Sequence, residues 1–189
     1  MDSIFGNDWE KEFELAWNRT FNEVQTSNKS LPTTKTGQIE IEKIVEQALR
    51  ELRQELGKTW LPNSIFGTRL HTKVADLVRG KNYSVFVEKP IKNFPHISIT
   101  TINMKVKDYL ANNNLAWLEK NLKRDQLIKS VGDLKPDLVI RGLATTIWDL
   151  TSRERTEHVA KTMLYAHILS SNNQLTRIAE TYWSKFRSK

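Results

Sequence analysis

Apolar residues near the N-terminus recur at helical spacing in two stretches, residues 7–25 and residues 38–56. In the first stretch the repeating residues are Trp9, Phe13, Trp17, Phe21 and Val24. In the second they are Ile41, Ile44, Val45, Ala48, Leu49, Leu52 and Leu56. Gly57 follows the second stretch and is typical of a helix end. The pattern predicts two helices that pack against each other, with no catalytic chemistry in residues 1–57.

The next part of the chain alternates between loop, helix and strand patterns. Residues 58–67 have the composition of a loop, and we predict that Thr68 caps a helix that runs to about Arg79. The runs YSVFVE (83–88) and ISITTI (97–102) are rich in β-branched and aromatic residues, so both are predicted to be strands. Apolar positions scattered over residues 104–131 predict a helical insert in several pieces.

A hairpin followed by a helix is the best-defined pattern in the C-terminal half. The runs DLVI (137–140) and TTIWDL (145–150) have strand composition and are separated by a short turn. Thr151 and Glu154 have the spacing of a capping box at a helix N-terminus. The apolar positions after them predict a helix that ends near Leu169.

The order of these elements predicts an α/β or α+β fold, with a short mixed sheet flanked by helices. Residues 175–183 fit either a strand or a helix, and we favour the helix. We divide the chain into an N-terminal helical segment, residues 1–57, and a main domain, residues 58–189. Within the main domain, residues 92–134 form the predicted helical insert.

Composition and charge narrow the function. The chain has 189 residues and no Cys, which excludes disulfides, thiol catalysis and Cys-ligated zinc. Residues 1–57 carry 7 Lys and Arg against 11 Asp and Glu, whereas residues 58–189 carry 22 against 11. A basic main domain indicates a polyanionic partner such as nucleic acid, although a solvated basic surface would have the same composition.

One cluster of basic residues lies next to the predicted hairpin. It consists of Lys120, Lys123, Arg124, Lys129 and Lys135. These side chains are candidates for contacts with nucleic-acid phosphates, and the alternative is a solvated helix face.

Two aspartates mark the chemistry of the hairpin. Asp137 opens the first strand and Asp149 lies near the end of the second, so a tight hairpin brings the two carboxylates together. Two adjacent like charges repel, and a hard divalent cation removes that cost. Glu88, at the end of an earlier strand, is a candidate for a third oxygen ligand, and His71 is placed to touch the same cluster. We therefore expect a Mg²⁺ or Mn²⁺ site.

Lys161 is the candidate for a catalytic cation beside these carboxylates. It shares a helix face with His158 and Tyr165, at i, i+3 and i+7. A lysine above two carboxylates can orient an attacking water or stabilise developing charge on a phosphate. The alternative is an ordinary helical ion pair between Lys161 and Glu157.

The pattern KPDLVIRGLATTIWDLTSRERTEHVAKTMLY, with GTRLHTKVADLV and VFVEKP upstream, resembles the PD-(D/E)XK nuclease superfamily, the restriction-endonuclease-like fold. The similarity covers about residues 67–170 and is greatest to nuclease domains of bacterial polymorphic toxins. The order of the site residues also resembles viral cap-snatching endonucleases. The resemblance implies that Asp137 and Asp149 bind metal and that Lys161 is the catalytic lysine, displaced from strand to helix. The chain departs from the family pattern at Thr151, where the family has Lys.

These observations predict a metal-dependent DNA endonuclease that acts as an antibacterial toxin, with an inhibitory immunity protein as a further partner. Two alternatives remain open: an RNA endonuclease of the same fold, or a non-catalytic nucleic-acid-binding module. The sequence has neither a signal peptide nor a long apolar run. We therefore expect no membrane partner, and a protein that is cytoplasmic or is exported without a signal peptide and acts in the cytoplasm of a target cell.

Overall fold

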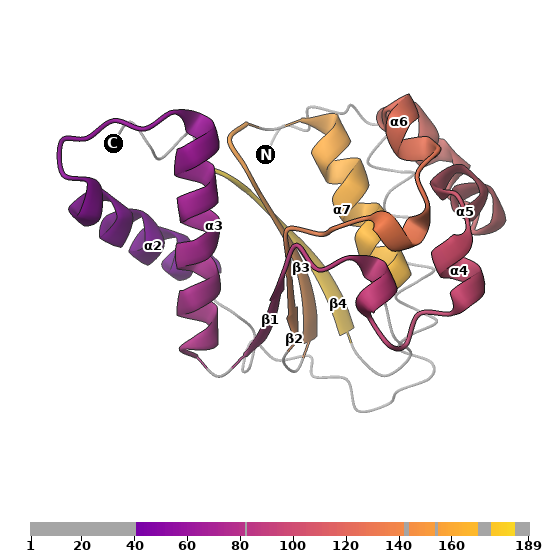
Figure 1. Cartoon of the computed structure of the whole chain (residues 1–189), viewed down its shortest axis with the longest axis horizontal. Helices are drawn as coiled ribbons and strands as arrows, with labels where there is room; N and C mark the ends of the chain where they lie inside the picture. Colours follow the sequence, from indigo (N-terminus) through magenta and orange to yellow (C-terminus); the bar gives the residue numbers. More distant parts are fainter. Residues whose placement is uncertain (1–40, 82, 142–143, 154, 170–174, 184–189) are drawn as a thin grey trace.

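The computed structural model describes residues 41–81, 83–141, 144–153, 155–169 and 175–183. It confirms an α+β fold built on a four-stranded sheet with helices on both faces (Figure 1). The strands follow one another across the sheet in sequence order: β1 (Ser84–Val87), β2 (Leu138–Arg141), β3 (Ala144–Thr151) and β4 (Leu175–Tyr182). The predicted helix at residues 7–25 lies outside the described residues.

Strand pairing confirms the predicted hairpin and overturns one prediction. Strands β1, β2 and β3 pair antiparallel, and β4 pairs with β3 in parallel. The prediction of a helix at 175–183 was therefore wrong. A parallel neighbour needs a crossover connection, and α7 (Thr156–Leu169) supplies it between β3 and β4. The crossover brings the segment alongside β3, where backbone pairing decides its conformation.

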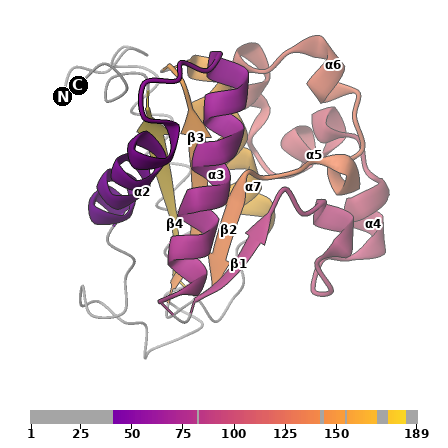
Figure 2. The same ribbon diagram turned by 60° about the vertical axis from the view of Figure 1, so that its left-hand side comes forward.

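One face of the sheet packs against α2 (Ile41–Leu56) and α3 (Asn63–Arg79), which lie together on one side in Figures 1 and 2. The strand residues buried on this face are Val85, Leu138, Ile140, Trp148 and Leu150. The sequence prediction placed the start of α3 too late: the helix begins directly after Pro62, and Thr68 lies within it. Pro62 is the N-cap residue, and its carbonyl accepts the first helical hydrogen bond, from Phe66 N at 2.9 Å.

The opposite face of the sheet packs against α7. Val139 and Ile147 are buried here with Phe94, Ala166 and Leu169. Successive residues in a strand point to opposite faces. Asp137 and Asp149, two residues from Val139 and Ile147, therefore belong to the α7 face of the sheet.

The predicted insert folds as short helical pieces that cover the far side of α7 (Figure 1). Its elements are η1 (Ile91–Asn93), α4 (Ile99–Asn103), α5 (Val106–Asn112), η2 (Ala116–Asn121), α6 (Arg124–Leu127) and η3 (Val131–Asp133). The strand predicted at 97–102 was wrong, because Ser98 caps α4: its Oγ accepts a hydrogen bond from Thr101 N at 3.2 Å. That local bond favours a helix start over a strand.

The predicted capping box was also wrong. Thr151 is the last residue of β3, and α7 begins at Thr156. The other end of α7, at Leu169, is as predicted. Among the described residues, no helix combines the length and the apolar character needed to cross a bilayer.

Two glycines give a matched test of the packing. A Cβ on Gly132 would lie 2.6 Å from Ile102 Cγ2, whereas a Cβ on Gly80 would meet nothing closer than 3.5 Å. We predict that Gly132→Ala lowers the free energy of unfolding by about 1–3 kcal/mol, because η3 and α4 must separate. Gly80→Ala is expected to be neutral or to stabilise by up to about 1 kcal/mol. Urea unfolding of both variants checks this, and equal effects would contradict the packing of α4 against η3.

Candidate functional site

The candidate site lies where β1 and β3 end and β2 begins. Val87, Leu138 and Trp148 lie side by side in the strand register, so the next position along the sheet holds Glu88, Asp137 and Asp149. Glu88 N donates a hydrogen bond to Asp137 O at 3.1 Å, which extends the β1–β2 ladder by one step. The register thus sets Asp137 directly opposite Asp149, as the sequence predicted.

The carboxylate of Asp137 reaches across to β3. Its Oδ2 accepts a hydrogen bond from Leu150 N at 3.3 Å, and this bond ties the start of β2 to the end of β3. The two aspartates are both only partly exposed. Asp137 is therefore held beside Asp149 by backbone pairing and by a bond from its own side chain.

His158, on the first turns of α7, lies over Asp149. The distance from His158 Nδ1 to Asp149 Oδ2 is 3.6 Å, and the Asp149 side chain is 13% exposed. Burial lowers the pKa of His158 below its usual value, and the nearby charge of Lys161 lowers that pKa further. The ring is therefore neutral at pH 7, and the contact is not an ion pair at that pH.

Lys161 stands on the same helix, one turn further on. Its Nζ lies 3.9 Å from Glu157 Oε1, so the i, i+4 ion pair considered from the sequence does form, although loosely. Glu157 is shared with Lys123 at 3.3 Å and with Gln126 at 3.3 Å. Because Glu157 has three partners, it holds Lys161 in position without neutralising it completely.

Tyr165 completes this side of the site. Burial raises the pKa of its hydroxyl, and the charges of Asp137, Asp149 and Glu157 raise it further. The hydroxyl therefore stays protonated at neutral pH and is a hydrogen-bond donor. Three carboxylates act on one hydroxyl, which places Asp137, Asp149, Glu157 and Tyr165 in one electrostatic cluster.

Glu88 and His71 lie on the α3 side of this cluster. The backbone of Glu88 has a φ of 48°, so the strand alternation ends there, and its side chain lines a pocket beside α3. His71 Nε2 donates a hydrogen bond to Leu150 O at 2.9 Å, which ties α3 to β3. Among the described residues, no group of three or more His, Asp or Glu side chains is gathered to hold a metal ion. The four candidate ligands, Asp137, Asp149, Glu88 and His71, therefore do not form a preformed metal cage, and their role in metal binding stays a prediction.

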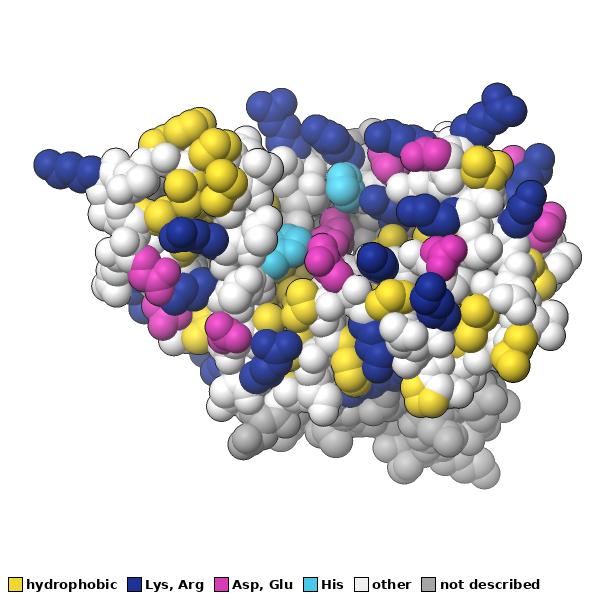
Figure 3. Space-filling view, viewed as in Figure 1, with side chains coloured by type: hydrophobic (Ala, Val, Ile, Leu, Met, Phe, Trp, Pro, Cys, Tyr) yellow, Lys and Arg dark blue, Asp and Glu magenta, His cyan; other side chains and the backbone are white. Residues whose placement is uncertain are grey.

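Basic side chains border the acidic cluster on the α7 side. Figure 3 shows acidic and histidine side chains at the centre of this face, with Lys and Arg beside them over α7 and the insert. A pocket of about 480 Å³ here has four lysines in its lining, namely Lys92, Lys129, Lys135 and Lys161. Of the predicted phosphate-binding residues, Lys129 and Lys135 line this pocket, and Lys123 pairs with Glu157 instead. Lys120 and Arg124 are exposed and do not line it.

Two side chains matter more in the structure than the sequence suggested. His158 and Glu157 both belong to the cluster, whereas the sequence indicates only that His158 shares a helix face with Lys161 and that Glu157 is its candidate ion-pair partner. The available signal was the helix face shared by His158, Lys161 and Tyr165, which the structure turns toward the strand ends.

Comparison of the chain with protein-family models, curated proteins and solved structures gives no match.

The electrostatics of the cluster can be tested by titration of His158. Lys161→Met should raise the pKa of His158, because a neighbouring positive charge is removed, and Glu157→Gln should lower it. Lys129→Met serves as a matched control, since Lys129 is exposed and is not one of the charges that account for the shift of that pKa. NMR titration of the imidazole resonances measures all three. Equal pKa values in wild type and Lys161→Met would contradict the cluster.

The lowered pKa of His158 also makes the stability of the folded chain depend on pH. Because folding lowers the pKa of His158, the unfolded chain takes up a proton more readily as the pH falls below about 6.5. The folded state then loses stability toward acid. His158→Gln removes this contribution, so between pH 7 and pH 5 the variant should lose less stability than wild type in urea unfolding.

Proposed function

We propose that the chain is a metal-dependent endonuclease that hydrolyses phosphodiester bonds of nucleic acid, with DNA as the favoured substrate. The observation that carries the proposal is the strand register that sets Asp137 opposite Asp149 at the sheet end. The helix α3, three antiparallel strands, the helix α7 and a parallel strand support it, because the restriction-endonuclease-like core is a mixed sheet flanked by helices.

The donor chemistry of the site fits Mg²⁺ or Mn²⁺. Asp137 and Asp149 offer carboxylate oxygens, the ligands that hard cations prefer. Magnesium is usually held by one or two carboxylates together with waters and substrate phosphate oxygens, so a pair of aspartates suffices without a closed protein cage. When bound, the ion supplies charge neutralisation at the scissile phosphate and a more acidic water. Asp137 and Asp149 would hold it.

The side chains of α7 then have distinct roles. Lys161 and the protonated Tyr165 hydroxyl are donors for phosphate oxygens, where negative charge grows as the phosphodiester is attacked. His158 is neutral at pH 7 and lies beside Asp149. The carboxylate favours the tautomer with the proton on Nδ1, which leaves Nε2 to accept a proton from water.

The pocket lined by Lys92, Lys129, Lys135 and Lys161, which we call the lysine pocket, would bind the nucleic-acid backbone. Lys161 lies beside the acidic cluster and also lines this pocket, together with Lys92, Lys129 and Lys135. A phosphate seated among these lysines would lie next to the one that reacts. As in the toxin domains that the sequence resembles, an inhibitory protein that covers this face would protect the cell that makes the enzyme.

Cleavage assays with point variants test the proposal. We expect wild-type protein to cut plasmid DNA with Mg²⁺ and to stop when EDTA is added. Asp137→Asn and Asp149→Asn should each lower the rate about a hundredfold or more, because they remove a metal-binding charge and keep the side-chain shape. Lys161→Met should lower it by about a hundredfold. Asp108→Asn, at an exposed position on α5, is the matched control and should cut at the wild-type rate.

The outcomes separate the alternatives. Equal cleavage by wild type and Asp149→Asn would refute the assignment of the site. Digestion of RNA but not of plasmid would change the substrate and leave the site as assigned. Salt-dependent binding of nucleic acid without cleavage in either metal would favour a non-catalytic binding module.

A further inference from the structure

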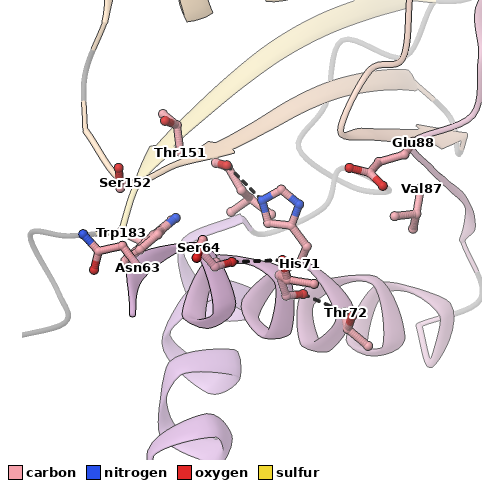
Figure 4. A pocket seen from close by; sticks show the side chains of 12 residues that line it. Asn63, Ser64, His71, Thr72, Val87, Glu88, Thr151, Ser152 and Trp183 are labelled. Carbon is pink, nitrogen blue, oxygen red and sulfur yellow. Dashed lines mark hydrogen bonds between the residues drawn. The ribbon is translucent and has the colours of Figure 1, made fainter. Parts of the chain in front are cut away.

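A second pocket opens on the other side of the strand ends, between α3 and the ends of β1 and β3. It has a volume of about 410 Å³ and includes Glu88, His71, Thr151, Ser152 and Trp183 in its lining. Figure 4 shows the α3 side chains below and the strand ends above, with Glu88 at one end. Glu88 is the residue in register with Asp137, so this pocket adjoins the acidic cluster directly.

The charge of this pocket differs from that of the lysine pocket. Of the described residues that line it, Glu88 is the one acid and none is Lys or Arg. Most of the others are small and polar, and Val87, Leu150 and Trp183 add apolar surface. A phosphate would be repelled here, whereas a neutral, flat, polar group with N–H donors would be favoured.

Hydrogen-bond acceptors face this space from two elements. The left-handed backbone at Glu88, with a φ of 48°, is costly for a residue with a side chain and points to a constrained position. His71 Nε2 carries the proton that binds Leu150 O, so in the neutral ring Nδ1 is an acceptor. Figure 4 shows this second nitrogen on the side of the ring that faces Glu88.

We propose that this pocket binds an unpaired guanine base of the substrate strand, with the Glu88 carboxylate accepting hydrogen bonds from N1–H and the N2 amino group. A carboxylate matches two adjacent N–H donors, and charge-assisted pairs of this kind are strong and directional. Guanine presents two such donors side by side. Adenine and cytosine present one donor beside a ring acceptor, and uracil and thymine present one donor between two carbonyl oxygens, so a carboxylate meets repulsion in each.

This inference rests on the proposed nuclease function and specifies its substrate. The base pocket and the lysine pocket lie on opposite sides of the acidic cluster, so one strand can place a base in the first and a phosphate in the second. In a duplex the N1–H and N2 amino groups of guanine are occupied by pairing. The pocket therefore takes a guanine that is unpaired, in a single strand or in a locally opened duplex, and the strand is cut next to that guanine.

Binding of mononucleotides without divalent metal tests the pocket apart from catalysis. The probes are 5′-GMP, 5′-IMP and 5′-AMP, which share the phosphate, and IMP lacks the N2 amino group. We expect GMP to bind wild-type protein about tenfold more tightly than IMP, and IMP more tightly than AMP, by NMR titration. Glu88→Gln should remove the preference for GMP, whereas Asp108→Asn should retain it.

The outcomes distinguish the two proposals. Equal affinity for the three nucleotides, or an unchanged GMP preference in Glu88→Gln, would overturn the base pocket even if Asp149-dependent cleavage is observed. Normal GMP preference without any cleavage would instead overturn the nuclease function and keep the pocket. Asp149→Asn should bind GMP as wild type does, and random cleavage of single-stranded oligonucleotides would also contradict the guanine assignment.

Discussion

The register of the β2–β3 hairpin is the constraint on which the site depends. Leu138 pairs with Trp148, and both are completely buried against α3. Burial of this pair forces Asp137 and Asp149 to the other face and to the same level of the sheet. A slip of β3 by one residue would turn Trp148 toward α7 and Asp149 into the core, at a prohibitive cost in free energy.

The same hairpin divides the surface into regions of different charge. On the α7 side the partly buried carboxylates lie among lysines, a neutral histidine and a protonated tyrosine. On the α3 side the pocket contains acceptors and no described Lys or Arg. The strand ends thus separate a surface rich in lysine from one whose lining has Glu88 as its charged side chain among the described residues, and the proposed function assigns phosphate to the first and a base to the second. A nucleic-acid strand is a polymer in which these two groups alternate.

Local patterns predicted the elements whose burial repeats regularly. The hairpin and the C-terminal end of α7 followed from strand composition and helical spacing, and the pairing of Asp137 with Asp149 followed from the hairpin. Predictions failed where distant parts of the chain decide the outcome. Strand β4 exists because α7 returns the chain beside β3. The strand predicted at 97–102 failed for a local reason instead, the Ser98 cap that starts α4.

The sequence predicted those parts of the site whose positions follow from the hairpin and from the helix after it. Asp137, Asp149 and Lys161 have spacings that a hairpin and its following helix bring together. Glu88 departs from the strand alternation because its backbone is left-handed, and His71 is committed to the Leu150 carbonyl. Neither feature leaves a trace in the residue pattern, since backbone conformation and hydrogen-bond partners arise only in the folded chain.

The most direct test of the central claim, that Asp137 and Asp149 share one cation, is Mn²⁺ binding measured by calorimetry in wild type, in Asp137→Asn, in Asp149→Asn and in the double variant. If one ion is shared, each single variant should weaken binding by about tenfold or more, and the double variant should bind little worse than either single one, because the effects of residues that act on one ligand are not additive. Wild-type affinity no higher than that of the double variant would contradict the account.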